Sequence, residues 1–143
     1  MKLQHQLLRE LLAAGKRVPV RYTGKSMFPT FCEGDELLIA ASPAWPIPIG
    51  TIVVFDEKSG LITHRVVRRV KQGARQGYVT RGDAFFVADP FLNHAKVVGI
   101  VTGFIRENQT FSLDSRGALL NAFLKAKYLP WKVRGVLWLK RLF

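Results

Sequence analysis

The chain has 143 residues, of which 48% are hydrophobic and 22% are charged. This length and composition are typical of one globular domain with a core of its own, and they exclude an intrinsically disordered chain. Lysine and arginine number 22 against 10 acidic residues, and the resulting net charge of +12 favours an anionic partner: nucleic acid, an acidic membrane surface or a negatively charged peptide.

Residues 1–15 predict a short amphipathic helix. Leucines recur at helical spacing and stop before Gly15, a residue common just beyond helix ends. Arg9 and Glu10 interrupt the leucine cluster, so it does not form the apolar region of a signal peptide. No stretch reaches the roughly 20 apolar residues that span a bilayer. We therefore expect no signal peptide and no transmembrane segment, and a location in the cytoplasm or peripherally on a membrane.

Residues 18–105 consist of short apolar and β-branched runs between turn segments. The runs are VPVRYT, ELLIAA, TIVVF, LITHRVVRRV, YVTRG and KVVGIVTGFI, and the segments between them include EGD, SPAWPIPIG, DEKSG and KQGARQG. This pattern predicts a mostly β fold, an antiparallel domain of about six strands. We expect residues 1–143 to form a single domain.

Residues 117–143 form a basic segment rich in aromatic and aliphatic residues. No acidic residue follows Asp114, and Pro130 divides the segment into two helix-like pieces. Such a basic amphipathic helical tail can lie in a membrane interface, with its cations toward anionic lipid. Alternatively, the tail packs on the sheet with its lysines in water.

Ser26, in the stretch GKSMFPT, is a candidate nucleophile only if folding brings a base to it. Taken alone it is an ordinary turn residue. His64, in LITHRVV, falls by strand alternation on the face of Ile62, Val66 and Val70, as a core histidine would. A half-buried imidazole on a rigid strand is also what a general base requires, because neutral histidine accepts a proton near pH 7.

A carboxylate is needed to orient such an imidazole, and the stretch RGDAFFVAD offers Asp83 and Asp89. Metal chemistry is not expected, because Cys32 is the single cysteine and the three histidines show no zinc-site spacing. We expect no cofactor.

Four segments in order resemble the conserved segments of a known family. They are GKSMFPTFCEGDELLI, PIGTIVVFDEKSGLITHRVV, YVTRGDAFFVAD and VVGIVTGFI. Together they resemble the type I signal peptidase superfamily, and more narrowly its Ser-His branch, found in archaea, the endoplasmic reticulum and some bacteria. The Ser-Lys branch, with bacterial leader peptidases and SOS-type repressors, has lysine where this chain has His64. The resemblance covers residues 23–105 and implies a signal-peptidase-like antiparallel β domain.

The resemblance also implies roles for individual residues. Ser26 falls on the nucleophile and His64 on the base, while Asp89 is implied to complete the triad and Asp83 to support it. The residues implied to bind substrate or the oxyanion are Gly24, Lys25, Met27 and Pro29.

Two features depart from the family pattern. Bacterial leader peptidases have a hydroxyl residue where this chain has Gly24, so backbone N–H groups near Ser26 must do more to hold the oxyanion. Signal peptidases normally carry a transmembrane anchor ahead of the serine, where this chain has the short leucine helix.

The expected function is a serine endopeptidase that cleaves extended peptide or leader segments after small residues. The expected partner is a peptide or protein substrate, with peripheral contact to anionic membrane through residues 117–143. The alternative is a non-catalytic basic β domain that binds nucleic acid or acidic partners. Nucleic acid is the less favoured partner, because basic and aromatic residues are not interleaved as in RNA-recognition domains, and too few residues precede Ser26 for a helix-turn-helix.

Overall fold

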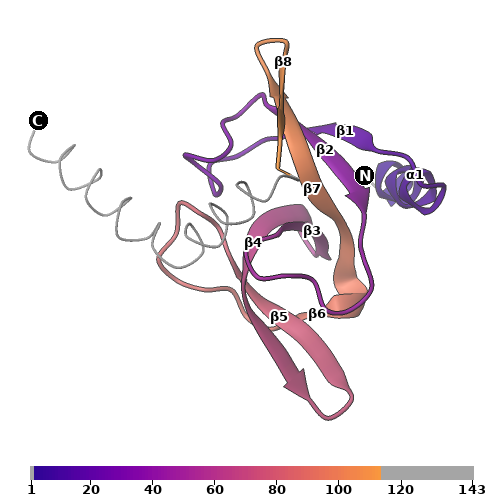
Figure 1. Ribbon diagram of the computed structural model, residues 1–143, viewed down its shortest axis with the longest axis vertical. Helices are drawn as coiled ribbons and strands as arrows, with labels where there is room; N and C mark the ends of the chain where they lie inside the picture. Colours follow the sequence, from indigo (N-terminus) through magenta and orange to yellow (C-terminus); the bar gives the residue numbers. More distant parts are fainter. Residues whose placement is uncertain (1, 114–143) are drawn as a thin grey trace, which may run out of the picture.

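The computed structural model describes residues 2–113 of the chain (Figure 1). The basic segment predicted at residues 117–143 lies outside the described residues. Within residues 2–113, no helix is long and apolar enough to cross a membrane.

One helix precedes a sheet of eight strands in the described part of the chain (Figure 1). The elements are α1 (Lys2–Ala13), β1 (Val18–Arg21), β2 (Glu36–Ala41), β3 (Ile52–Glu57), β4 (Gly60–Gln72), β5 (Arg75–Arg81), β6 (Leu92–Asn93), a 3₁₀ turn η1 (His94–Lys96), β7 (Val97–Arg106) and β8 (Gln109–Ser112). The predicted mostly antiparallel β fold with a short amino-terminal helix is confirmed. The six predicted strands correspond to β1–β5 and β7, whereas β6 and β8 were not predicted.

The strand order is β1-β2-β7-β3-β4-β5-β6, and β8 pairs with β7. Every pair is antiparallel. Strand β1 therefore stands at one end of the order, five places from β5. The pairing of β4 with β5 shifts register between Val66 and Arg68, a β-bulge that adds local twist.

Two hydrophobic clusters lie on opposite sides of β3. Ile52 and Val54 belong to the first cluster, and Val53 and Phe55 belong to the second. Because both faces of β3 are buried, its sequence is a continuous apolar run and not an alternating one.

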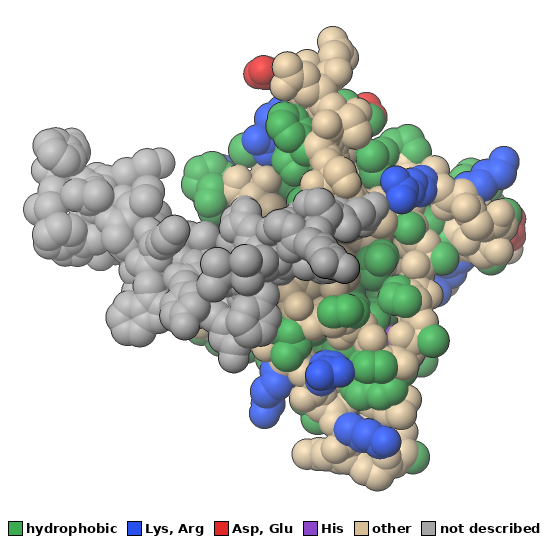
Figure 2. All heavy atoms as spheres, viewed as in Figure 1, with side chains coloured by type: hydrophobic (Ala, Val, Ile, Leu, Met, Phe, Trp, Pro, Cys, Tyr) green, Lys and Arg blue, Asp and Glu red, His purple; other side chains and the backbone are tan. Residues whose placement is uncertain are grey.

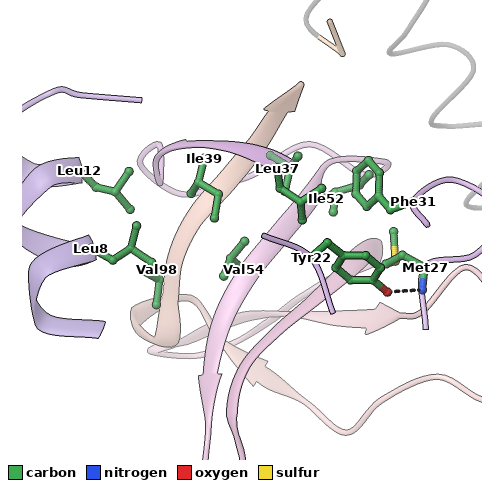
Figure 3. Close-up of a cluster of buried hydrophobic side chains, with 11 residues drawn as sticks. Leu8, Leu12, Tyr22, Met27, Phe31, Leu37, Ile39, Ile52, Val54 and Val98 are labelled. Atoms are coloured by element: carbon green, nitrogen blue, oxygen red, sulfur yellow. Dashed lines mark hydrogen bonds between the residues drawn. The ribbon is translucent and has the colours of Figure 1, made fainter. Parts of the chain in front are cut away.

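Helix α1 covers part of the first cluster. Leu8 and Leu12 are buried and pack toward Ile39, Val54 and Val98 (Figure 3). Leu3 and Leu7 of the same helix are exposed, with 78% and 55% of their surface accessible. Only one stripe of the predicted leucine face is therefore used for packing against the sheet.

Candidate active site

Ser26 lies on the loop between β1 and β2, and this loop is held at both ends. The N–H of Tyr22 donates to the carbonyl of Asp35 at 2.8 Å, and the N–H of Gly34 donates to the carbonyl of Tyr22 at 3.0 Å. Met27 and Phe31 are fully buried and fasten the loop to the first cluster. The half-buried Ser26 is thus attached to a packed segment despite lying outside a strand.

An ion pair secures the far end of this loop. Arg106 of β7 donates from Nε and Nη2 to the two carboxylate oxygens of Asp35, at 2.9 and 2.6 Å. The hydrogen bond from Arg106 holds the pKa of the Asp35 carboxyl below its ordinary value, and the N–H of Cys32 acts in the same direction. Asp35 is buried, with 3% of its side chain exposed, whereas the Arg106 side chain is 35% exposed, so only the carboxylate side of the pair is shielded from water.

His64 of β4 is buried and held by a carboxylate. Its Nδ1 lies 2.5 Å from Oδ2 of Asp89. The same Oδ2 accepts a hydrogen bond from the Thr80 hydroxyl at 2.7 Å, and the N–H of Asp89 donates to the carbonyl of Thr80 at 2.8 Å. An imidazole that donates Nδ1–H to a carboxylate keeps Nε2 as a proton acceptor, which is the tautomer a general base needs.

Two phenyl rings shield this imidazole from water. Phe55 and Phe85 each stand edge-on to the ring of His64, with centroids 6.1 Å away. The apolar rings lower the local dielectric, and this strengthens the interaction between His64 and Asp89.

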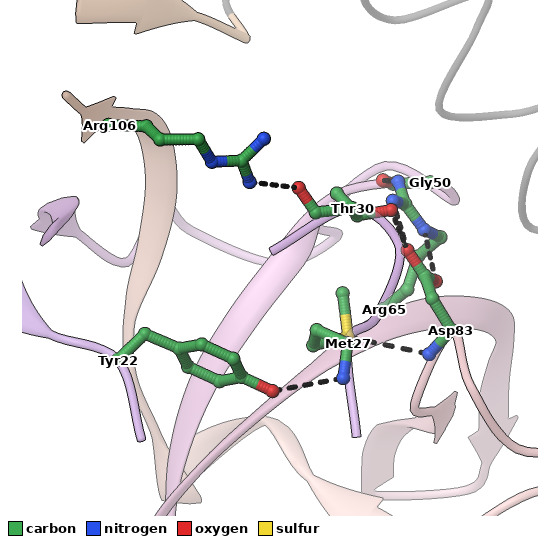
Figure 4. A network of polar contacts seen from close by, with 7 residues as sticks. All are labelled: Tyr22, Met27, Thr30, Gly50, Arg65, Asp83 and Arg106. Atoms are coloured by element: carbon green, nitrogen blue, oxygen red, sulfur yellow. Dashed lines mark hydrogen bonds and ion pairs between the residues drawn. The ribbon is translucent and has the colours of Figure 1, made fainter. Parts of the chain in front are cut away.

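Arg65, the next residue on β4, pairs with the other aspartate. Its Nε and Nη2 donate to the two carboxylate oxygens of Asp83 at 2.8 and 2.7 Å, and Nη1 donates to the carbonyl of Gly50 at 2.8 Å. Asp83 also accepts from the hydroxyl of Thr30 at 2.5 Å (Figure 4). Asp83 therefore joins the serine loop to β4, whereas Asp89 holds the imidazole.

Gly82 lies between Ser26 and His64. A Cβ atom on Gly82 would be 2.6 Å from the carbonyl oxygen of Ser26 and 3.1 Å from Nε2 of His64. The N–H of Ala84 also donates to that carbonyl at 2.9 Å. The free nitrogen of the imidazole and the backbone of the serine therefore meet at the same glycine.

The Ser26 hydroxyl itself contacts a tyrosine. Its Oγ lies 3.3 Å from the hydroxyl oxygen of Tyr22. Among the described residues, no hydrogen bond joins Ser26 directly to His64, although both side chains line the same cavity. Without substrate, catalytic hydrogen bonds are often long or poorly aligned, and they tighten when substrate binds.

This cavity has a volume of about 730 Å³ and lies between α1, β1 and the start of β4. Its walls are largely apolar and include Leu7, Leu11, Val18, Val20 and Leu61. A volume of this size is in the range of binding clefts for small ligands or short peptide segments.

The other residues expected around Ser26 differ in exposure. Gly24 has a φ of 108°, a conformation that favours glycine, and the side chains of Lys25 and Pro29 are exposed. The side chain of Met27 is fully buried, and its N–H donates to the Tyr22 hydroxyl at 2.9 Å. Met27 therefore contributes packing and a hydrogen bond to Tyr22. Because its N–H donates to that hydroxyl, it does not point to an oxyanion in this structure.

Three contributors to the site were not singled out from the sequence: Tyr22, Thr80 and Arg65. Arg65 could have been recognised from the sequence, because a charged residue within the apolar run LITHRVV needs a buried partner. Tyr22 and Thr80 could not have been recognised beyond their positions at the ends of apolar strands, since tyrosine and threonine are ordinary strand residues.

The basic side chains of the described residues do not form one continuous patch on the face seen in Figure 2. Figure 2 shows lysine and arginine side chains at several separate places on the visible face, not as one stripe.

Among residues 2–113, no group of three or more histidine, cysteine and acidic side chains is arranged to hold a metal ion. No protein-family model matches the chain, and no curated protein matches it significantly.

Proposed function

We propose that the protein is a serine endopeptidase similar to signal peptidases of the Ser-His type. The observation that carries the proposal is the contact of His64 Nδ1 with Asp89, at 2.5 Å, which leaves Nε2 as the proton acceptor in a cavity that Ser26 also lines. The order of the four sequence segments supports the same assignment.

In the proposed reaction, Ser26 Oγ attacks the carbonyl carbon of the peptide bond while its proton moves to Nε2 of His64. The tetrahedral intermediate collapses when the imidazolium returns that proton to the departing amine. Water then hydrolyses the acyl-enzyme with His64 again as base. Asp89 keeps the ring oriented and stabilises the imidazolium, and Thr80 keeps Asp89 in place.

The proposed substrate is an extended peptide lying in the cavity between β1 and β4. Strand β1 pairs on one side with β2 and stands at the end of the strand order, so a peptide strand can add to its edge. The cavity reaches from β1 to residues 60–64 of β4, which leads the peptide past both Ser26 and His64. Small residues before the cut are proposed from the family resemblance.

A serine-directed acylating probe tests the proposal. We expect a fluorophosphonate to label the wild-type protein at Ser26, located by mass spectrometry of the digested protein. Ser26→Ala abolishes the labelling and His64→Ala slows it strongly. The matched control is Ser59→Ala, because Ser59 lines the same cavity but does not contact the imidazole cluster. Labelling that survives Ser26→Ala, or none in the wild type, would rule out the proposal.

A further inference from the structure

Tyr22 is the buried residue that touches the Ser26 hydroxyl. It is 6% exposed and packs edge-on against Phe31, with ring centroids 5.9 Å apart. Its hydroxyl oxygen accepts the N–H of Met27 at 2.9 Å and lies 3.3 Å from Oγ of Ser26. The phenol is therefore held in place by its ring packing and by a backbone donor.

Which hydroxyl donates in the hydrogen bond between Tyr22 and Ser26 follows from the other partners of the Tyr22 hydroxyl. A phenol has one proton to donate, and a buried hydroxyl proton without an acceptor costs free energy. Met27 N–H is a donor, so it cannot take that proton. In the part of the chain that the structure describes, Ser26 Oγ is the acceptor available to Tyr22.

If Tyr22 donates to Ser26, the serine's own proton points away from the phenol. Nε2 of His64 lies next to Gly82, and the His64 side chain lines the same cavity as Ser26. Because Nδ1 of His64 faces the Asp89 carboxylate, Nε2 is the ring nitrogen that can accept that proton. Donation by Tyr22 therefore leaves the serine proton free for Nε2 once substrate binding brings the two side chains within hydrogen-bond reach.

We propose that Tyr22 is a catalytic residue, whose hydroxyl donates a hydrogen bond to Ser26 Oγ and directs the serine proton to His64. This inference rests on the proposed function and adds a fourth group to it. During attack, Oγ forms a bond to the substrate carbonyl carbon and its proton goes to Nε2, while Tyr22 keeps its own proton. During hydrolysis of the acyl-enzyme, Oγ is the leaving oxygen, and the bond from Tyr22 stabilises the negative charge that develops there.

The length of the bond fits this role. At 3.3 Å it is longer than a usual hydroxyl–hydroxyl hydrogen bond. Hydrogen bonds shorten and strengthen when the acceptor becomes charged, so the contact contributes more as charge grows on Oγ. A group that acts in this way raises kcat and leaves substrate binding nearly unchanged.

Tyr22→Phe tests the inference, and Tyr78→Phe is the matched control. Tyr78 is also fully buried and also accepts a backbone N–H, from Ile47 at 3.0 Å, but it belongs to the second hydrophobic cluster. Both substitutions keep the ring and leave one N–H without its acceptor, and Tyr78→Phe also removes a 2.7 Å contact with Nδ1 of His94, so it costs at least as much stability. The readouts are kcat and KM on an alanine-containing peptide, the rate of fluorophosphonate labelling, and the thermal unfolding temperature.

We expect Tyr22→Phe to lower kcat and the labelling rate by about 10- to 100-fold, the effect of one hydrogen bond to a charged group, with KM unchanged. Tyr78→Phe should lower the unfolding temperature at least as much and leave kcat near the wild-type value. The effect of Tyr22→Phe should also shrink in a His64→Ala background, because both residues act on the same oxygen.

Two outcomes would overturn the inference, and they are distinguishable. If the wild type is active and Tyr22→Phe changes kcat no more than Tyr78→Phe does, Tyr22 is only a packing residue and the peptidase assignment stands. If the wild type neither cleaves peptide nor reacts at Ser26, the proposed function fails and the role of Tyr22 fails with it.

Discussion

Gly82→Ala places a methyl group against both the backbone of Ser26 and the imidazole of His64. The new Cβ would lie 2.6 Å from the carbonyl oxygen of Ser26, 2.9 Å from Cδ2 of Phe85 and 3.1 Å from Nε2 of His64. Non-bonded carbon and oxygen atoms rest at roughly 3.5 Å, so the Ser26 backbone must retreat by about 1 Å. That carbonyl is also fixed by the N–H of Ala84, so the retreat strains the loop.

A displacement of about 1 Å between reacting groups costs about 100-fold in rate, or about 2.7 kcal/mol in the activation free energy. We therefore expect Gly82→Ala to lower kcat/KM on a peptide substrate by about that factor. Fluorophosphonate labelling of Ser26 should slow in parallel. Circular dichroism and thermal unfolding show how much protein remains folded, so that activity is compared per folded molecule.

Gly103→Ala is the control for this experiment. Its Cβ would lie 2.5 Å from the carbonyl oxygen of Phe111, a clash of the same kind in the β7–β8 pair. We expect Gly103→Ala to lose stability while each folded molecule keeps its activity. A folded Gly82→Ala variant with wild-type kcat/KM would show that the rate does not depend on the spacing at Gly82.

The remaining predictions concern the polar contacts around the site. Asp89→Asn removes the charge that holds the imidazole, and peptide hydrolysis should show a fall of about 10²- to 10⁴-fold in kcat; unchanged kcat contradicts the triad. Thr80→Val removes one bond to that carboxylate and should cost about tenfold in kcat, whereas an effect on KM alone would argue against an orienting role. Arg65→Met removes the ion-pair partner of the buried Asp83, and denaturant unfolding should show a loss of about 3–5 kcal/mol. The double variant Arg65→Met/Asp83→Leu should recover much of that loss, and a double variant as unstable as the single one would count against the pairing. The folded-state pKa of Asp35 is lowered, so as pH falls the unfolded chain binds this proton before the folded protein does. The stability that Asp35 contributes is therefore fully present above about pH 4, and it is lost as pH falls through the folded-state pKa. Asp35→Asn should reduce the fall in the free energy of unfolding that denaturation shows at acidic pH. If that fall is unchanged in the variant, other groups cause it.

The main features of the fold were predictable because strand periodicity is a local property of the sequence. Strands β6 and β8 could not be found in this way, because Leu92–Asn93 is too short for an alternating pattern and Gln109–Ser112 is exposed throughout. The turn before β8 places Glu107 and Asn108 at positive φ, which a hairpin turn needs but which Glu107 does not signal.

The face of β4 shows where alternation ceases to hold. Ile62 and Val66 pack in the second cluster on the side of His64, as alternation predicts. The bulge between Val66 and Arg68 inserts a residue, and Val70 beyond it is only half-buried. A bulge depends on how two strands pair, so one strand's sequence does not reveal it.

The site was predictable only as a set of residue types. Alternation places His64 and Arg65 on opposite faces of β4, but it does not say which aspartate each one meets. The bond between Thr30 and Asp83 joins residues far apart in the chain, and it depends on the folded path of the serine loop. The contact of Tyr22 with Ser26 likewise requires the turn at Gly24.

Hydrolysis of a library of extended peptides, followed by mass spectrometry of the products, tests the central claim most directly. We predict cleavage by the wild type after small residues, with no cleavage by Ser26→Ala and strongly reduced cleavage by His64→Ala, while both variants unfold at temperatures near that of the wild type. Cleavage that persists in Ser26→Ala, or a folded wild type that cleaves no peptide, would contradict a peptidase built on these residues.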